Sequence, residues 1–435
     1  MITRTRLYAA LFVLAPAVAA KPGAAQSQGD VAAEFSRWAS QNVFELPTGT
    51  GTGGIAWIAG LARNASVLGI GESAHDVHDF LTLRTLITRK LIERGRVSAV
   101  AMETSLADAT AVDAWVAGRE STPPDLQRAL SFGFGQESEL EQFFQWLRAY
   151  NAAHRNHQVH FYGADLPADG GGSLQPALTP VWAYLRKVDP DYARGAVAAI
   201  DPVAKQLDAR GYEIVGKYGQ LSSASRDSLH RSLDALASRF TANKHNYIRR
   251  SSTGEFAWTQ RLVEVARQTE EAVRTGWNDA TNPRDRAMAA NIEWITSRQY
   301  GRGLVVVWAH NLHISRVPIG GPIFAERGPP VKSMGQYLKE RYGDRYVAIG
   351  TTFRTGGPDT TSSPDPQSVD AALAALHSPR FGIVIRGAPT RGPVAEWLDS
   401  AHPMRGENGY VTVRPRAAFD ALMFVDSVRG SIHLR

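Results

Sequence analysis

The chain of 435 residues contains no cysteine. Without a thiol it can form no disulfide, no iron–sulfur cluster, no cysteine-ligated zinc site and no cysteine nucleophile. It also contains neither a Walker A sequence nor a G-x-S-x-G motif, so a P-loop ATPase and an ordinary serine hydrolase have no support. Histidine and carboxylate side chains remain as the groups best suited to catalysis.

Blocks of like charge are also missing, although the formal net charge is +6. The 40 arginines and 8 lysines are spread along the chain, and no run of five like charges occurs. A dispersed basic charge of this kind is typical of a solvated surface. We therefore expect no nucleic-acid partner.

Long apolar runs are scarce, and one of them stands near the N-terminus. Arg4 and Arg6 precede the apolar residues 7–18, and small residues follow as far as Ala25. This order predicts a signal peptide over residues 1–26 and a periplasmic or secreted protein. The run is shorter than the roughly 20 apolar residues that cross a bilayer, so we expect no stable membrane span. Removing the three basic residues of this segment would reduce the net charge to +3.

Short β-branched runs alternate with helical patterns along most of the chain. This alternation predicts an α/β fold with a mostly parallel central sheet flanked by helices. Several of the runs are almost continuously apolar, as expected for strands that are buried on both faces. The expected strands are 66–70, 98–102, 158–162, 304–308, 346–351, 381–385 and 421–425.

Residues 174–300 have little strand character and read as an all-helical insertion. We expect it to form a cap over a cleft at the strand ends, between the two parts of an α/β core formed by residues 27–173 and 301–435. The helices expected from periodicity are 79–94, 140–150, 178–188, 222–247, 256–277 and 284–300.

The first apolar strand ends in a carboxylate that is followed closely by an imidazole. Gly69 and Gly71 allow a sharp exit from the strand, and Glu72 precedes His75 by three residues. In open α/β sheets, ligands bind at this carboxyl end of the strands. A glutamate can fix the tautomer of an imidazole or stabilise its protonated form, which favours His75 as a general base. The alternative is an ordinary turn with polar helix caps, Asp79 among them.

Another buried strand, 304–308, leads into His310 and His313. Two imidazoles at a strand end can bind a metal, polarise a carbonyl or transfer protons; the alternative is a hydrogen-bonded structural pair. Two further strands end in acids, Glu103 and Asp165. A parallel sheet would bring all of these strand ends to one edge.

The segment that begins at Arg284 opens a helix that also contains Asn291. Asp285 near its N-terminus is favourable to the helix dipole, which is the structural interpretation. The functional interpretation directs Arg284 or Asn291 into the cleft.

These motifs resemble the signature of the erythromycin esterase family. The resemblance spans roughly residues 30–432, in the family's order. The matching segments are G-E-S-A-H with Asp79, Phe80 and Arg84, A-M-E-T at 101–104, Y-G-A-D at 162–165, R-D-x-x-M-A-x-N at 284–291, W-A-H-N-x-H-I at 308–314, Ser333-Met-Gly335 and Phe419-Asp-Ala421.

The resemblance implies an α/β core with a helical insertion and hydrolysis of an ester or lactone, macrolides among them, by metal-independent attack of water. It implies that His75 is the general base and that Glu72 orients it. Arg84 and a histidine would supply donors to the oxyanion. The residues that it matches to catalysis are His75, Glu72, Arg84, Glu103, His310 and His313, and we expect Asp165, Trp308, Arg284 and Asn291 to bind the substrate.

Two other functions remain open from the sequence. One is a metallohydrolase with Glu72, His75, His310 and His313 as ligands. The other is a haem- or iron-binding envelope protein without catalysis. Our leading expectation is a small-molecule hydrolase that needs no cofactor.

Overall fold

The computed structural model describes residues 22–47, 54–167, 173–209, 213–276, 281–299, 301, 303–321, 331–357, 365–407 and 409–434. The expected signal peptide lies outside these residues except for 22–26, which open helix α1. Within the described part of the chain, no helix has both the length and the apolar character needed to cross a bilayer.

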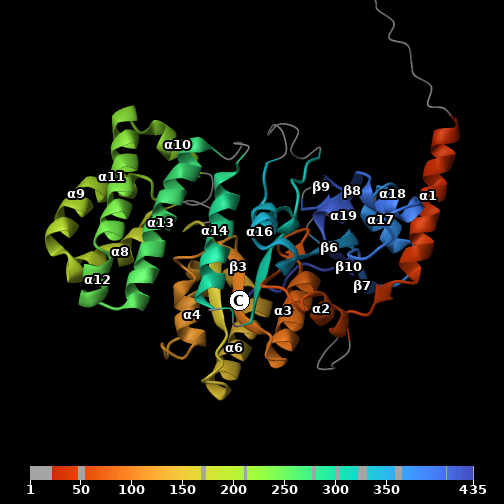
Figure 1. Ribbon diagram of the computed structural model, residues 1–435, viewed down its shortest axis with the longest axis horizontal. Coiled ribbons are helices and arrows are strands. Elements are labelled where there is room, and N and C mark those ends of the chain that lie inside the picture. Colours follow the sequence, from red (N-terminus) through yellow and green to blue (C-terminus); the bar gives the residue numbers. More distant parts are fainter. Residues whose placement is uncertain are drawn as a thin grey trace, which may run out of the picture.

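An eight-stranded sheet forms the centre of the molecule (Figure 1). Its order is β1-β7-β10-β6-β2-β5-β3-β4. The six strands from β10 to β4 are parallel, and β7 near one edge pairs antiparallel with both β10 and β1. The strands are β1 (Val43–Phe44), β2 (Val67–Glu72), β3 (Val97–Ser105), β4 (His160–Asp165), β5 (Leu304–His310), β6 (Tyr346–Gly356), β7 (Arg380–Val384) and β10 (Ala421–Val428). The expected mostly parallel sheet is therefore confirmed.

Helices cover both faces of the sheet and one of its edges. In the core they are α1 (Pro22–Ser40), α2 (Ala56–Leu61), α3 (His78–Glu93), α4 (Thr110–Val116), α5 (Leu126–Ala129), α6 (Ser138–Ala153), α14 (Pro283–Arg298), α15 (Asn311–Ile314), α16 (Met334–Tyr342), α17 (Val369–Ala374), α18 (Pro393–Asp399) and α19 (Pro415–Ala418). A separate hairpin consists of β8 (His402–Gly406) and β9 (Gly409–Val413).

The remaining helices form a lobe at the left of Figure 1, which we call the helical lobe. It consists of α8 (Gln175–Val188), α9 (Pro190–Gln206), α10 (Glu213–Gln220), α11 (Ser223–Ala242), α12 (Lys244–Arg250) and α13 (Thr253–Thr275). The helix expected over 222–247 is interrupted at Asn243, whose side chain donates to the carbonyl of Arg239 and ends α11. Helix α14, expected within the insertion, packs on strand β4 and on α16.

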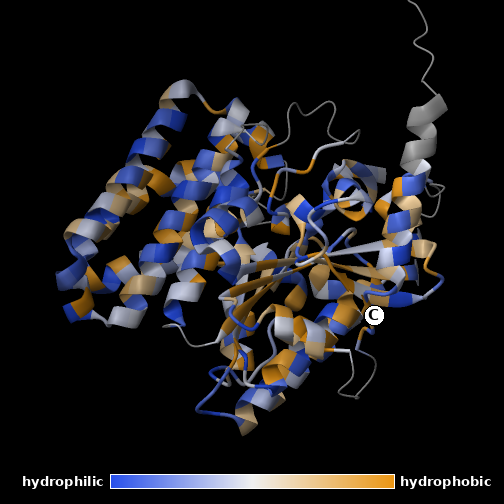
Figure 2. Cartoon of the chain, turned by 45° about the vertical axis from the view of Figure 1, so that its right-hand side comes forward, coloured by the Kyte–Doolittle hydropathy of each residue, from blue (hydrophilic) through white to orange (hydrophobic). Residues whose placement is uncertain are grey.

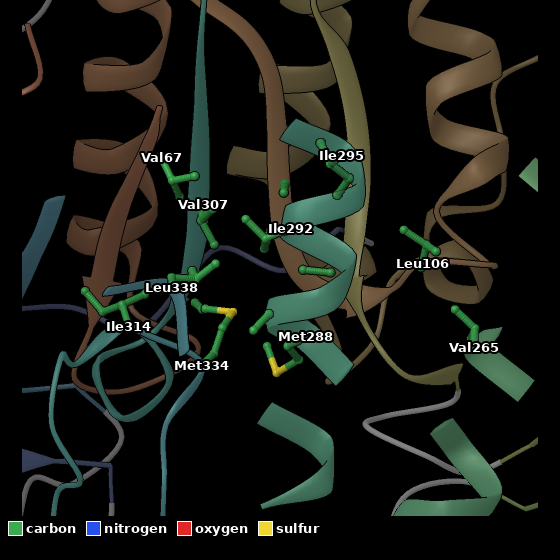
Figure 3. Close-up of a cluster of buried hydrophobic side chains, with 14 of the residues drawn as sticks. Val67, Leu106, Val265, Met288, Ile292, Ile295, Val307, Ile314, Met334 and Leu338 are labelled. Atoms are coloured by element: carbon green, nitrogen blue, oxygen red, sulfur yellow. The ribbon is translucent and has the colours of Figure 1, made fainter. Parts of the chain in front are cut away.

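Alternate residues of the strands face two different hydrophobic layers. Val305 and Val307 of β5 belong to the layer that includes α14 and α16, whereas Val306 and Trp308 belong to the layer of α3 and α6. Figure 3 shows the first layer, in which side chains of α14 and α16 lie beside Val307. The strands are accordingly orange along much of their length in Figure 2, and the helices alternate between orange and blue.

The connections that leave β2 and β5 run in opposite directions. Helix α3 leads from β2 to β3 over one face of the sheet, and α16 leads from β5 to β6 over the other. Because β2 and β5 are neighbours, the connections that follow them diverge between the carboxyl ends of these two strands. A topological switch of this kind is the usual place for a ligand site in an open α/β sheet.

Candidate active site

The carboxyl ends of four parallel strands bring the expected acids and imidazoles together. Glu72 at the end of β2 is paired in register with His310 at the end of β5. Asp165 at the end of β4 is paired with Ser105 of β3, two residues beyond Glu103. Both strand pairs lie next to the switch point, so the sheet itself sets the spacing of these side chains.

Glu72 lies between His75 and Arg84 and bonds to both. Its Oε1 accepts from the Nδ1 of His75 at 2.9 Å, and its Oε2 is 2.9 Å from the Nη1 of Arg84. Burial alone would raise the pKa of Glu72, but the charge of Arg84 and the hydrogen bond from His75 lower it below its usual value. The arrangement holds Glu72 ionised and fixes one nitrogen of His75.

The ring of His75 is surrounded by other rings but remains accessible, with 15% of the side chain exposed. It stacks on Phe132, meets the edge of Phe134 with ring centroids 5.1 Å apart, and lies at a steep angle to His310. Burial alone would lower the pKa of His75, yet the hydrogen bond and charge of Glu72, with the charge of Glu103, raise it to about 9. Its Nε2 has no hydrogen-bond partner among the described residues.

His310 is fixed in one neutral tautomer by the backbone. Its Nε2 donates to the carbonyl of Ser73 at 2.9 Å, and its Nδ1 accepts from the amide of Leu312 at 3.2 Å. Burial and the nearby charge of His75 lower the pKa of His310 to about 4. Both ring nitrogens are therefore engaged, and the ring joins the loop after β2 to the start of α15.

His313 lies between two carboxylates and forms an ion pair with each. Its Nδ1 is 2.8 Å from Asp285, and its Nε2 is 3.1 Å from Glu103. Burial alone would lower the pKa of His313, but the charges of these two acids raise it to about 10. The same Glu103 pairs with Arg284, which also contacts Asp165 at 2.6 Å. The result is a chain of alternating charges on the α14 side of the sheet.

The close packing at the strand ends explains two glycines. A Cβ at Gly71 would come within 2.2 Å of the side-chain oxygen of Asn311. The side-chain amide of Asn311 is fixed, because it donates to the carbonyl of Thr351 and accepts from the amide of Thr351. A Cβ at Gly163 would come within 2.2 Å of the carbonyl of Ser105. A side chain at either position would push apart the strands that carry Glu72 and Glu103.

Residues 429–434 hold the loop that carries His75. The amide of Ser431 donates to the carbonyl of Asp76 at 2.9 Å, and the amide of His78 donates to the carbonyl of Arg429 at 3.0 Å. On the other side, the amide of Ser138 donates to Ile432. This 429–434 segment thus joins the His75 loop to the start of α6. Beneath it, burial and the charge of Asp76 raise the pKa of Glu137 to about 8.

Two residues that we expected to bind the substrate, Trp308 and Asn291, have side chains that cannot reach it. Trp308 is fully buried in the layer of α3 and α6, where its Nε1 donates to Thr88 at 3.0 Å, so it offers no surface to a substrate. Asn291 is also fully buried and joins α14 to Ala164 and Arg261. Trp308 was expected to bind substrate because its motif ends a strand, and Asn291 because its helix could have pointed it into the cleft, but both side chains point into the core.

Arg84 is placed behind Glu72 rather than where an oxyanion would form. Only 2% of it is exposed, and its guanidinium lies over the rings of Trp308 and Phe134, at 5.3 and 5.9 Å from their centroids. The expectation that it donates to the oxyanion therefore does not fit its position. Its contact with Glu72 makes it a positioning residue.

Sequence reasoning missed two residues of the cluster. Asp285 was interpreted as a helix-dipole residue, yet it pairs with His313 and accepts from the amide of Met334 at 2.7 Å. Phe132 lies between His75 and Arg284, whose guanidinium is 5.5 Å from its ring centroid. In the sequence its signal was weak, an aromatic residue directly before Gly133; the positive φ of 56° at Phe132 is seen only in the structure.

The donor atoms of the cluster do not form an evident metal site. Across the described residues, no group of three or more His, Asp or Glu side chains is arranged to hold a metal ion. Two of the expected ligands, His310 and His313, already use both ring nitrogens within the protein. A zinc site needs at least three protein donors, which the expected set of four could supply only by breaking these bonds.

Comparison with known proteins points to one family. The sequence profile of erythromycin esterases matches residues 92–428. Erythromycin esterase type II from Escherichia coli is 26% identical over 302 residues, which cover 67% of this chain and 69% of that protein. Erythromycin esterase type I, also from Escherichia coli, is 23% identical over 402 residues, which cover 85% and 92%.

Solved structures share the fold at lower identity. A Bacillus cereus protein superimposes with a TM-score of 0.78 at 22% identity, covering 93% of this chain and 99% of its own. A mutant of the erythromycin esterase EreC in its open conformation superimposes with a TM-score of 0.68 at 19% identity, covering 86% and 94%. The residues matched by the profile begin after Arg84, so the roles of Glu72, His75 and Arg84 rest on the contacts described above.

Proposed function

Because the chain belongs to the erythromycin esterase family, we propose that it hydrolyses a carboxylic ester or lactone with His75 as the general base. Hydrolase activity follows from the family; the residue roles and the choice of bond are our proposal. The observation that carries it is the free Nε2 of His75, held beside solvent while Nδ1 is bound to a buried, ionised Glu72. An imidazole fixed in this way can take a proton from water.

Charge balance supports this direction of proton transfer. With His75 neutral, the ion-paired cluster contains one more carboxylate than cation, and the charge of a further acid, Glu407, also acts on His75. The excess of negative charge falls when His75 takes a proton. The carboxylates are those of Glu72, Glu103, Asp165 and Asp285, and the cations are Arg84, Arg284 and His313. The cluster therefore stabilises the imidazolium that forms in the transition state, which is how a preorganised site lowers a barrier.

The proposed reaction proceeds by attack of water on the ester carbonyl. His75 takes the proton through Nε2, a tetrahedral intermediate forms, and the imidazolium returns the proton to the leaving alcohol. Arg284 and His313, with 15% and 13% of their side chains exposed, are the cations of the cluster that reach solvent. We assign the stabilisation of the oxyanion to Arg284, whose Nη1 has no hydrogen-bond partner among the described residues, in place of Arg84. His313 contributes its charge only, because both of its ring nitrogens are bound to carboxylates.

Hydrolysis is tested with erythromycin, simple lactones and aryl esters, using mass spectrometry to detect a product heavier by one water. We expect turnover of at least one ester by the wild type and its loss in His75→Ala. The matched control His154→Ala, at an exposed position far along the chain at the end of α6, should retain full activity. Equal turnover by the wild type and His75→Ala would remove His75 from the mechanism.

We also propose that no metal takes part. The support is that His310 and His313, two of the four candidate ligands, have both ring nitrogens engaged within the protein. Activity should be unchanged in excess chelator. Loss of activity in chelator with recovery on adding Zn²⁺ would favour the metallohydrolase instead.

Export remains part of the proposal, on the pattern of residues 1–26 alone. Expression of the full chain in a Gram-negative host and N-terminal sequencing of the periplasmic fraction tests it. A mature N-terminus between about residues 20 and 27 is expected for this type of signal. Retention of the intact chain in the cytoplasm would argue against export.

A further inference from the structure

A second concave region, which shares no residue with the acid cluster, lies along β4, the edge strand of the sheet. Here a cavity of about 380 Å³ opens between α4, the start of β4, the end of α14 and helix α13 of the helical lobe. His160 lines this cavity and Asp165 belongs to the candidate active site; the two residues are five positions apart on β4, which corresponds to about 16 Å. Leu106, at the other end of the cavity, donates its amide to the carbonyl of Asp165. The volume falls in the range of about 300–1,000 Å³ that is usual for small-molecule sites.

Aromatic rings form the walls of this cavity. Trp258 of α13 and Trp294 of α14 have ring centroids 5.6 Å apart, and Tyr162 meets Trp294 edge-on at 6.2 Å. All three residues are only half-buried, so apolar ring surface remains in contact with water. Flat aromatic faces at a concave surface are suited to stacking with a planar ligand.

The one carboxylate of the cavity is engaged on both oxygens, whereas one of its cations has no ion pair among the described residues. The carboxylate of Asp113 accepts from the amide of Phe161 at 3.0 Å, from His160 at 3.1 Å and from Arg119 at 2.6 Å. Although burial alone would raise the pKa of Asp113, the hydrogen bond and charge of His160 lower it. Asp113 is therefore a saturated anion that organises the rim.

Arg298 is the cation without such a partner. Its guanidinium lies over the ring of Trp294, 5.6 Å from the centroid, and among the described residues it forms no ion pair. Together with Arg119 it gives the cavity two guanidinium groups against one carboxylate. A ligand that complements this lining brings an anionic acceptor to Arg298 and a flat apolar body to the tryptophans.

We propose that this cavity binds a small planar aromatic carboxylate, with its ring against Trp258 and Trp294 and its carboxylate on Arg298. The site is distinct from the catalytic cluster, although helix α14 carries residues of both: Arg284 at its beginning and Trp294 at its end. The proposal does not depend on the ester hydrolysis proposed above.

Isothermal titration of the full chain with 2-naphthoate tests the proposal. We expect 1:1 binding, and binding at least tenfold weaker for 2-naphthamide, which lacks the charge, and for cyclohexanecarboxylate, which lacks the aromatic ring. Absence of binding at millimolar 2-naphthoate, or equal affinity for the three compounds, would overturn it.

Variants locate the binding. Arg298→Gln and Trp258→Leu should each weaken 2-naphthoate at least tenfold, whereas Arg249→Gln, an exposed arginine of α12 outside the cavity, should leave it unchanged. His75→Ala should also bind normally. Circular dichroism confirms folding; if Trp258→Leu does not fold, the half-buried Arg298 decides the result alone. Weakening in His75→Ala but not in Arg298→Gln would place the ligand in the catalytic cluster and refute the second site.

Discussion

His75 follows strand β2 and His313 follows the neighbouring strand β5, yet the two imidazoles have different hydrogen-bond partners. His75 has one carboxylate partner and a free Nε2, whereas both nitrogens of His313 are bound to carboxylates. Both rings have pKa values raised above the usual range, to about 9 and about 10. A raised pKa therefore does not distinguish a proton acceptor from a structural cation; the number of uncommitted ring nitrogens does.

The largest effect that separates the two imidazoles should come from removing His75. We expect His75→Ala to lower kcat by about 10²–10⁴-fold, the usual contribution of a general base. The free energy of unfolding should change little, since the ring has only one hydrogen bond and is partly exposed. Steady-state kinetics together with urea denaturation measures both; a stable variant with normal kcat would contradict the assignment.

Removing a partner of His313 should act on stability instead. Asp285→Asn leaves a buried imidazolium beside Glu103 alone and also weakens an acceptor for the amide of Met334. We expect a loss of about 3 kcal/mol in the free energy of unfolding, as for other buried ion pairs that lose one member. Asp191→Asn, in an exposed ion pair with Arg194, is the matched control and should have no measurable effect.

The stability that Asp285→Asn loses should depend on pH in one direction. The folded pKa of His313, about 10, lies above its ordinary value, so its contribution is fully present below about pH 6.5 and is lost as pH rises through about 10. The gap in stability between the wild type and Asp285→Asn should therefore narrow at alkaline pH. A gap that widens between neutral pH and pH 10 would contradict the charged state of His313.

The pH dependence of the rate sharpens the assignment of His75. Because its pKa is about 9, the neutral base is a minor form at neutral pH, and kcat/KM should rise about tenfold per pH unit until about pH 9. Glu72→Gln removes the charge that raises this pKa, so the rising limb should move to lower pH. A wild-type profile that is flat between about pH 6 and 9 would exclude His75 as the titrating base.

A smaller effect is expected from the residue that holds Glu72. Arg84→Met keeps the stem that packs between Phe134 and Trp308 but removes the charge that faces Glu72. We expect a loss of about tenfold or more in kcat, typical of groups that orient a catalytic residue, with KM nearly unchanged. If KM increases and kcat is retained, Arg84 contacts the substrate and is not a positioning residue.

The smallest effect should come from the buried face of β5. Trp308→Phe removes the hydrogen bond to Thr88 but keeps an aromatic ring in the core. We expect a stability loss of about 1 kcal/mol, the net value of such a bond plus slight packing loss, and no change in kcat or KM. A change in substrate preference would show that Trp308 has a functional role that its burial does not suggest.

The strands of the central sheet were the part of the fold that the sequence could predict. The expected strands all formed, because apolar β-branched runs specify buried parallel strands, and their ends brought Glu72, Glu103 and His310 together. The strands extend further than expected because polar ends such as Glu72 still pair in register with His310. The hairpin β8–β9 was missed because a segment such as HPMRG has little strand character.

The hydrophobic pattern of the sequence could not predict where individual side chains point. Trp308 and His310 are two residues apart, so they share one face of β5, but Trp308 packs among the helices whereas His310, also buried, belongs to the cluster at the carboxyl end of the strand. Asp285 was interpreted as an acid that favours the helix dipole, because nothing along the chain shows that His313 would lie against it. Partners separated by long stretches of sequence are set by topology, and only the folded chain reveals them.

The 429–434 segment has a consequence for the order in which the protein becomes active. The contact between Asp79 and Arg429 joins residues 350 positions apart, and it closes the loop that presents His75. During synthesis, the sheet strands β2 to β5 can emerge and pair long before residues 429–434 are made. The base should therefore reach its working geometry only in a late step of folding, and the appearance of activity during refolding should lag behind the formation of the sheet.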